Sequence, residues 1–208
     1  MEVKELAELL TAQGKTVSVA EACTCGLVGY LLGTAPGASR YFPGGVIAYT
    51  GGLKQRILGV PDALYETQGS VSRDMAIAMA RGVRQLTGTD FGISTTGVTG
   101  PALGRSGHPI GTFFIGLSVT DGEDRAIEIH VQGDRDSTKR GAAQAAIDLL
   151  GRHLKGGCAS PFFAAAHARC YTLGRITYGN ETVTGAGARH YGQSGAGFRL
   201  PGVGPGPL

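Results

Sequence analysis

Short β-rich segments alternate with helical segments through the first 155 residues, and this alternation restricts the fold more than any other feature. Strands that alternate with helices indicate a layered α/β architecture. The Asp121-Gly122 pair predicts a hairpin between the last two strands, so the sheet is expected to be mixed. The predicted strands cover residues 16–20, 45–50, 90–96, 110–120 and 125–131. The predicted helices cover residues 3–13, 26–32, 51–58, 72–86 and 136–153, with Ser72 as an N-cap.

Glycine accounts for 36 of the 208 residues, and the excess falls into two regions. In residues 1–155 many glycines lie at predicted turns, and acidic and basic residues balance. Residues 156–208 are rich in Gly and Pro, contain four Arg and one acid, and carry the whole net charge of +3. We therefore predict one folded domain over residues 1–155, followed by a Gly/Pro/Arg-rich tail without stable structure. The tail is interpreted as a disordered extension, a partner-binding segment or the product of a shifted reading frame.

Composition also argues against several classes of protein. The charge balance of residues 1–155 gives no electrostatic support for nucleic-acid binding. The four cysteines, at positions 23, 25, 158 and 170, form no CxxC pair and no Cys/His set with zinc spacing, so no metal site is predicted. No apolar stretch approaches the length of about 18 residues that a membrane span needs. Because the N-terminus has the pattern of an acidic amphipathic helix rather than a signal peptide, we expect a cytoplasmic protein with reduced thiols.

Ligands of open α/β sheets bind beyond the carboxyl ends of the strands. Polar, glycine-containing turns fall at three such ends, over residues 21–26, 50–54 and 96–104. In the last turn, Gly97, Thr99 and Gly100 offer backbone N–H groups and a hydroxyl that suit a phosphate. Gly26 opens a helix, and a helix N-terminus attracts an anion. Taken alone, the Gly/Thr loop is interpreted at least as well as an ordinary turn, but two such loops at one edge together favour an anionic ligand there.

Tyr49 and Lys54 flank the turn after the second predicted strand. A lysine at a strand end neutralises an anion or, when it is desolvated, acts as a base. The alternative is a solvated surface lysine, which the sequence pattern alone favours.

The segment Cys23-Thr24-Cys25 lies just before a predicted helix. A thiol in that position is a candidate nucleophile, because the helix dipole lowers its pKa. The alternative is that the cysteines are small buried hydrophobic residues.

Seven short motifs, in this order and at matching spacing, resemble the C-terminal domain family of CinA: AEACTCG (20–26), YFPGGVIAYTGGLK (41–54), LGVP (58–61), GSVS (69–72), TTGVTGP (95–101), PIGT (109–112) and GDRD (133–136). The resemblance runs from about Val3 to Leu154. It implies a three-layer α/β/α domain that hydrolyses the carboxamide of nicotinamide mononucleotide to nicotinate mononucleotide and ammonia, without a metal or organic cofactor. It further implies a stand-alone form lacking the MoaB-like domain, and homo-oligomers.

The family pattern has a nucleophilic serine in A-E-S-C-T-G-G, a tyrosine and a lysine in Y-[ST]-N-x-x-K, a Ser/Thr before G-[IV]-x-G-P and an arginine after G-D-R. The resemblance and the turn chemistry together make candidate catalytic residues of Cys23, Thr24, Tyr49, Lys54 and Thr96. Candidate substrate-binding residues are Gly26, Gly97, Thr99, Gly100 and Arg140. We expect Arg140 rather than Lys139 to bind the substrate, because arginine binds phosphate or carboxylate in a bidentate manner.

The sequence departs from the family pattern at three positions: Ala22 replaces the nucleophilic serine, Cys25 replaces a glycine and Gly51 replaces an asparagine. Alanine has no hydroxyl, so family-type covalent catalysis cannot proceed at Ala22. Three explanations follow: a nucleotide-binding homologue with little activity, a substitute nucleophile among Cys23, Thr24 and Cys25, or a water molecule activated by Lys54 or Tyr49. Adjacent side chains on a strand point in opposite directions, so Cys23 would need a local twist to replace residue 22.

Overall fold

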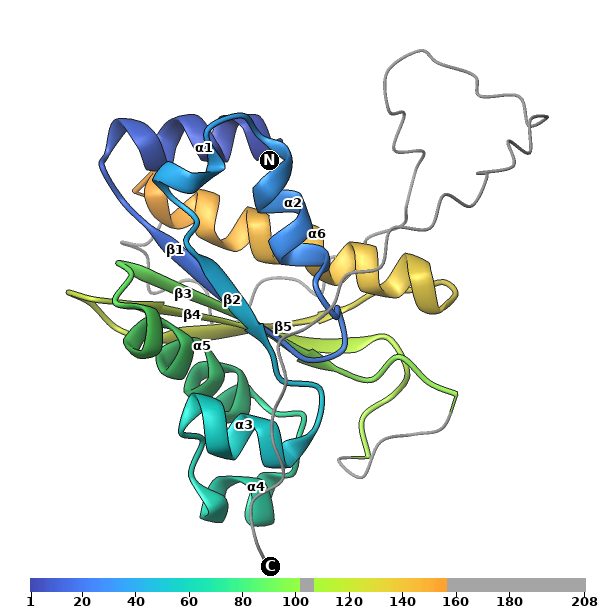
Figure 1. Cartoon of the computed structure of the whole chain (residues 1–208). Coiled ribbons are helices and arrows are strands. Elements are labelled where there is room, and N and C mark those ends of the chain that lie inside the picture. The colour runs from blue at the N-terminus through green and yellow to red at the C-terminus, as the bar shows by residue number, and fades with distance from the viewer. Residues whose placement is uncertain (102–106, 157–208) are drawn as a thin grey trace, which may run out of the picture. The chain divides into compact units, whose positions relative to one another are not determined.

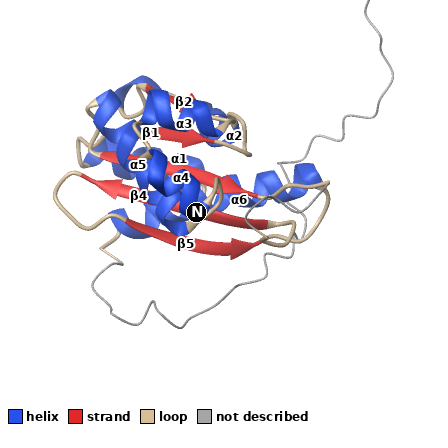
Figure 2. Cartoon of the chain, turned by 90° about the horizontal axis from the view of Figure 1, so that it is seen from below, coloured by secondary structure: helices blue, strands red, loops and turns tan. Residues whose placement is uncertain are grey.

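The computed structural model describes residues 1–101 and 107–156, and these residues form a mixed five-stranded sheet between two layers of helices (Figure 1). The strands are β1 (Val17–Glu21), β2 (Gly44–Ile47), β3 (Phe91–Gly97), β4 (Thr112–Val119) and β5 (Arg125–His130). They lie in the order β2-β1-β3-β4-β5, with β2 at one edge and β5 at the other (Figure 2). β1 pairs in parallel with β2 and β3, whereas β4 is antiparallel to β3 and β5. The predicted three-layer α/β/α fold with a mixed sheet is confirmed. The predicted tail over 156–208 lies outside the described residues except for Gly156.

The helices cover both faces of the sheet. α1 (Val3–Ala12), α2 (Leu27–Thr34) and α6 (Arg135–Leu154) cover one face, and α3 (Gly51–Leu58), α4 (Asp62–Gln68) and α5 (Arg73–Thr87) cover the other (Figure 1). Three buried apolar clusters fill the layers. The largest joins Leu6 and Leu10 of α1 to Ile115 of β4 and Ile147 of α6. A second surrounds Met75 and Met79 of α5, and a third includes Phe114 of β4.

Each predicted element is present, with its bounds moved by a few residues, and the structure adds two short helices. The second strand was predicted to reach residue 50 but ends at Ile47, so Tyr49 lies in a loop. Residues 59–61 separate α3 from α4, and Pro61 occupies the N-cap position of α4, where it breaks no hydrogen bond; α4 itself was not predicted. A 3-10 helix over Ala38–Arg40 was also missed.

Glycines bring α5 close to the centre of the sheet. A Cβ atom at Gly92 of β3 would clash with the carbonyl of Ala80, and one at Gly116 of β4 would clash with the carbonyl of Ala76. Larger residues in β3 and β4 would therefore push α5 away. The predicted N-cap of α5 is confirmed, because the Oγ atom of Ser72 accepts a hydrogen bond of 3.1 Å from the amide of Met75.

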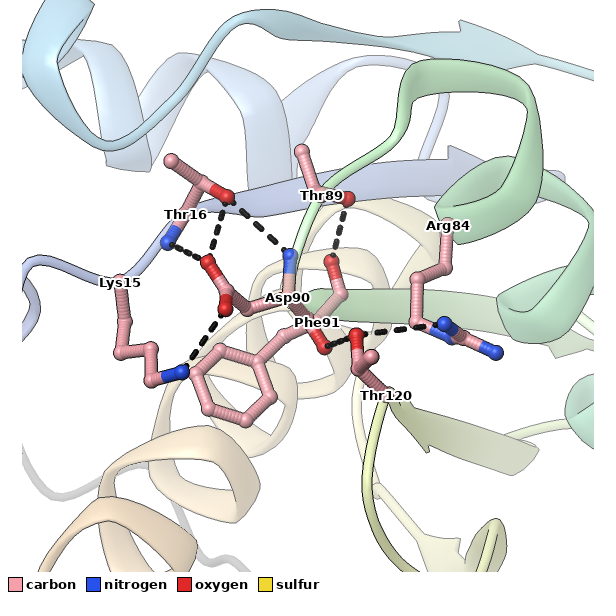
Figure 3. Close-up of polar contacts among 7 residues, drawn as sticks. All are labelled: Lys15, Thr16, Arg84, Thr89, Asp90, Phe91 and Thr120. Atoms are coloured by element: carbon pink, nitrogen blue, oxygen red, sulfur yellow. Dashed lines mark hydrogen bonds and ion pairs between the residues drawn. The ribbon is translucent and has the colours of Figure 1, made fainter.

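Asp90 joins the amino ends of β1 and β3 (Figure 3). Its carboxylate accepts hydrogen bonds from the amide and hydroxyl of Thr16, at 2.9 and 2.8 Å, and from Nζ of Lys15 at 2.9 Å. Burial acts to raise the pKa of Asp90, but these hydrogen bonds outweigh burial and hold the pKa below its usual value. This network fixes the edge of the sheet that lies opposite the predicted ligand edge.

We predict that Cys25→Gly stabilises the protein by about 0.5–1 kcal/mol. Cys25 is exposed and has a φ angle of +54°, and no other non-glycine residue in the described ranges has a positive φ. Glycine adopts this left-handed conformation without strain, and the gain exceeds its greater entropy in the unfolded chain. Urea unfolding of the two proteins measures the difference. Cys25→Ala serves as the control, because it removes the thiol and keeps the strain; equal stability of the glycine and alanine variants would contradict the prediction.

Candidate active site

The carboxyl ends of β1, β2, β3 and β5 meet at one edge of the sheet, and a cleft of about 680 Å³ opens there. Its lining comes from Tyr49 after β2, residues 65–71 at the junction of α4 and α5, residues 97–100 after β3, and Arg135 at the start of α6. Four segments distant in sequence therefore meet at the edge where the sequence predicts ligand binding. The predicted substrate-binding residues Gly97, Thr99 and Gly100 lie in this lining.

Lys54 of α3 is buried, with only 1% of its surface exposed, which corrects the interpretation of a solvated surface lysine. Its Nζ atom donates hydrogen bonds to the carbonyl of Ser70 at 2.8 Å, to Oγ of Ser70 at 3.0 Å and to Oγ1 of Thr96 at 3.1 Å. All three partners are neutral oxygen atoms. Burial without a carboxylate partner disfavours the charged amine and lowers the pKa of Lys54 to about 8.

Thr96, at the end of β3, donates its hydroxyl proton to the carbonyl of Ser70 at 2.7 Å. Lys54, Ser70 and Thr96 therefore form one hydrogen-bonded cluster built from α3, the turn before α5 and β3. The sequence prediction placed Lys54 and Thr96 in the site, and the structure brings them into contact. It missed Ser70, although Ser70 lies in the GSVS motif, just after a glycine and two residues before a helix N-cap.

Glu21, the last residue of β1, is buried and binds the N-terminus of α2 with its carboxylate. The carboxylate accepts hydrogen bonds from the amides of Gly26, Val28 and Gly29, at 2.8 to 3.2 Å. It also accepts the hydroxyl of Thr24 at 2.7 Å. The anion expected at Gly26 is thus supplied by the protein itself, so this helix N-terminus does not offer these N–H groups to a substrate.

Thr24 is fully buried, and its hydroxyl lies 2.6 Å from that of Thr95 in addition to contacting Glu21. It supports the turn between β1 and α2, and Figure 1 shows this turn at the end of β1. Its hydroxyl donates its proton to the carboxylate of Glu21, and its side chain is not exposed to solvent. The structure therefore gives Thr24 a role in shaping the turn.

Ala22 and Cys23, the two residues that follow β1, pack in different apolar clusters. Ala22 packs in the apolar cluster around Met75, and its amide donates to the carbonyl of Thr95 at 3.0 Å. Cys23 belongs to the largest cluster, on the other face of the sheet, where burial raises the pKa of its thiol to about 12. The expectation that the helix dipole lowers this pKa is wrong, because desolvation dominates. Cys23 is a buried apolar residue and holds almost no thiolate at neutral pH.

Tyr49 and Arg135 meet at the mouth of the cleft. Arg135 donates to the hydroxyl of Tyr49 at 2.9 Å and to the carbonyl of Gly100 at 2.8 Å. Both side chains are exposed and therefore accessible to a ligand. Arg140, which the sequence analysis selected, lies one and a half turns further along α6 and pairs with Asp136 at 2.6 Å. The GDRD motif includes Arg135, and the sequence prediction missed its place in the cleft. The available signal was its position at the start of a helix.

Tyr65 of α4 fills the space beside Gly51. A Cβ atom at Gly51 would clash with the ring of Tyr65, so no side chain fits at position 51 while the ring lies there. Tyr65 also lines the cleft. The family resemblance places an asparagine at position 51, and in this chain an aromatic ring from another helix takes up that space.

Two negative findings concern the ranges 1–101 and 107–156. No group of three His, Cys, Asp or Glu side chains in these ranges is arranged to hold a metal ion. None of the helices described there combines the length and apolar character needed to cross a membrane.

Comparisons with known proteins agree on one family. The family described as the CinA C-terminal domain matches residues 2–154. A CinA-like protein from Gloeobacter violaceus is 43% identical over 150 residues, which span 71% of this chain and 35% of that protein. A CinA-like protein from Leptospira biflexa is 40% identical over 149 residues, which span 72% of this chain and 36% of that protein.

Solved structures give the same result. A CinA superfamily protein from Klebsiella pneumoniae aligns with a TM-score of 0.71 and 25% identity, covering 74% of this chain and 96% of the other. A CinA superfamily protein from Escherichia coli aligns with a TM-score of 0.70 and 27% identity, covering 73% and 87%.

We predict that the stability of the protein rises between pH 8 and pH 10.5 relative to a Lys54→Met variant, by about 3 kcal/mol. The pKa of Lys54 is about 8 in the folded chain and 10.5 in its unperturbed state, so in this window the unfolded chain binds more protons. The cost of burying the amine is fully present below pH 8 and is lost as pH approaches 10.5. Denaturant unfolding across this range measures the difference, with Lys4→Met at an exposed position as the control. Parallel profiles for wild type and Lys54→Met would contradict the prediction.

Proposed function

The chain belongs to the CinA C-terminal domain family, and on this premise we propose that it hydrolyses the carboxamide of nicotinamide mononucleotide to nicotinate mononucleotide and ammonia. The observation that carries the proposal is the buried Lys54 amine, held by neutral oxygen atoms beside an open cleft. Amide hydrolysis needs a group that removes a proton from the nucleophile and then protonates the departing nitrogen. Lys54 can perform both steps.

The pKa of about 8 suits Lys54 to this work. About a tenth of the amine is neutral at pH 7, and the ammonium that forms after it takes a proton is a strong enough acid to protonate ammonia as it leaves. An ordinary surface lysine, with a pKa near 10.5, would be neutral about 300 times less often.

The cleft suits a mononucleotide in size and charge. Its volume of about 680 Å³ lies in the range of small-molecule sites. Arg135 is exposed at the mouth, where its guanidinium can bind the phosphate in a bidentate manner while Tyr49 holds it in place. Gly97, Thr99 and Gly100 bring the chain after β3 to the same side. We assign the phosphate to this end of the cleft and the carboxamide to the end near Ser70 and Lys54.

One observation favours a second candidate function. Ala22 places only a methyl group where the family pattern has a nucleophilic serine, and it packs among apolar side chains. On this reading the protein binds a pyridine nucleotide through Arg135 and Tyr49 but turns it over slowly or not at all. Binding without turnover would then make it a nucleotide sensor or binding module.

We predict that the purified protein releases ammonia from nicotinamide mononucleotide, and that Lys54→Met slows release by about 10²–10⁴-fold. Arg135→Ala should raise KM about tenfold or more with a smaller change in kcat, since it removes a charged contact to phosphate. Release is measured by coupled ammonia detection, and Lys4→Met is the matched control.

Titration calorimetry with nicotinamide mononucleotide separates the two candidate functions. Binding without release, with release restored by Ala22→Ser, would refute the native enzyme and support the binding module. Absence of both binding and release would contradict both.

The rate should also depend on pH with one defined sign. Because the neutral amine of Lys54 is the active form, we predict that kcat/KM rises about tenfold per pH unit below pH 8 and levels off above it. Steady-state rates between pH 6 and pH 9.5 measure this profile. A rate that is flat across pH 8, or that falls as pH rises through it, would rule out Lys54 as the base.

A further inference from the structure

We propose that Ser70 is the nucleophile of this site and that Lys54 is its general base. This role rests on the proposed amidase function for its substrate, but the reactivity of Ser70 can be tested without that substrate. The inference starts from the distance of 3.0 Å between Oγ of Ser70 and Nζ of Lys54. A hydroxyl becomes a useful nucleophile when it lies within hydrogen-bond reach of a base.

Of the groups around Lys54, only one hydroxyl is available to donate a hydrogen bond to the neutral amine. As an ammonium, Lys54 has three N–H groups, and they go to the Ser70 carbonyl, the Ser70 hydroxyl and the Thr96 hydroxyl. When the ammonium loses a proton, the amine gains a lone pair, and this lone pair must accept a hydrogen bond from a neighbouring hydroxyl. The Thr96 hydroxyl already donates to the Ser70 carbonyl at 2.7 Å. The hydroxyl of Ser70 is therefore the one free to donate to Lys54, which is the arrangement of an activated serine.

Ser70 also has access to the substrate. It is half-buried and lines the cleft, whereas Lys54 is 1% exposed and is not part of the lining. Lys54 thus reaches Ser70 from the protein side, and the substrate reaches it from the cleft. This placement keeps water away from the base while leaving the nucleophile open.

The other candidate nucleophiles in the described residues are less suited. Ala22 has no hydroxyl, and the thiol of Cys23 is buried with a pKa of about 12. Thr24 is fully buried, and its proton is bonded to Glu21. Cys25 is exposed, and no hydrogen bond joins it to a base. Of the residues compared, Ser70 alone combines a hydroxyl, a neighbouring amine and a place in the cleft lining.

The proposed reaction balances through two steps. Oγ of Ser70 bonds to the carboxamide carbon as its proton passes to Lys54, and the carbonyl π pair moves to oxygen. Collapse of this intermediate breaks the C–N bond, and Lys54 returns the proton to the leaving nitrogen, which departs as ammonia. Water then attacks the ester on Ser70, giving one proton to Lys54. Lys54 passes this proton to Oγ as the ester C–O bond breaks, and the product is released as the carboxylic acid, which ionises.

The first test uses a fluorophosphonate ester, a probe that phosphonylates activated serines with loss of fluoride. We expect the full-length chain to be labelled on the peptide containing Ser70, located by mass spectrometry. Lys54→Met should lower the labelling rate by about 10²–10⁴-fold. Ser39, which is exposed and outside the cleft lining, should remain unlabelled.

The second test measures ammonia release. Ser70→Ala should lower kcat by about 10³-fold or more with KM little changed, and Ser39→Ala should behave as wild type. Folding of Ser70→Ala is protected because the bonds from Lys54 and Thr96 to residue 70 use the backbone carbonyl. In Ser70→Cys, iodoacetamide should alkylate the new thiol faster than it does in the Ser70→Cys/Lys54→Met double variant.

The two tests separate failure of this inference from failure of the proposed function. Labelling of Ser70 without ammonia release supports the serine–lysine pair and counts against nicotinamide mononucleotide as the substrate. Ammonia release that survives Ser70→Ala, without labelling of Ser70, supports the amidase and overturns the assignment of Ser70. Absence of both labelling and release also overturns it.

Discussion

The carboxylate of Glu21 holds the carboxyl edge of the sheet together. It ties the end of β1 to the first turn of α2 through three backbone amides, and Thr24 links it to Thr95 of β3. A buried carboxylate of this kind is stable only when its oxygen atoms are fully hydrogen-bonded, and here backbone amides and one hydroxyl do so. Lys54, by contrast, donates only to neutral oxygen atoms of Ser70 and Thr96. The same edge therefore contains the hydrogen-bonded carboxylate of Glu21 and the amine of Lys54, whose pKa is lowered.

Two departures from the family pattern change the chemistry available in this cleft. The methyl group of Ala22 removes a hydroxyl from the end of β1, and Gly51 removes an amide from the start of α3. Neighbouring segments supply other groups: Tyr65 of α4 occupies the space beside Gly51, and Ser70 contacts Lys54. Both come from the chain between α3 and α5, which lies along the same side of the cleft. A group on one element can take the place of a group lost from another, because catalysis depends on geometry and not on position in the sequence.

Local pattern was enough to predict a layered α/β fold with a mixed sheet and the edge that carries the cleft, because strand and helix periodicity and glycine turns are properties of short segments. The three-layer arrangement was implied by the family resemblance. Local pattern also placed Tyr49, Lys54 and Thr96 at that edge. It could not predict the burial of Lys54, which is covered by a turn 16 residues further along the chain. The choice between Arg135 and Arg140 depends on the start of α6, and element boundaries are the least certain part of any pattern. The pKa of Cys23 depends on its burial in an apolar cluster whose members are distant in sequence.

The groups that meet at the cleft are far apart in the sequence. The lowered pKa of Lys54 therefore arises only once the chain has folded. Tyr49 and Arg135 are 86 residues apart, and Lys54 and Thr96 are 42 apart, so these contacts form only after distant parts of the chain have come together. In a nascent or unfolded chain, Lys54 is surrounded by water and remains protonated at neutral pH. Its amine becomes a base only when α3, the turn before α5 and β3 enclose it. Under the proposed mechanism, folding is therefore the activating step, because a partly folded chain has no lysine with a lowered pKa.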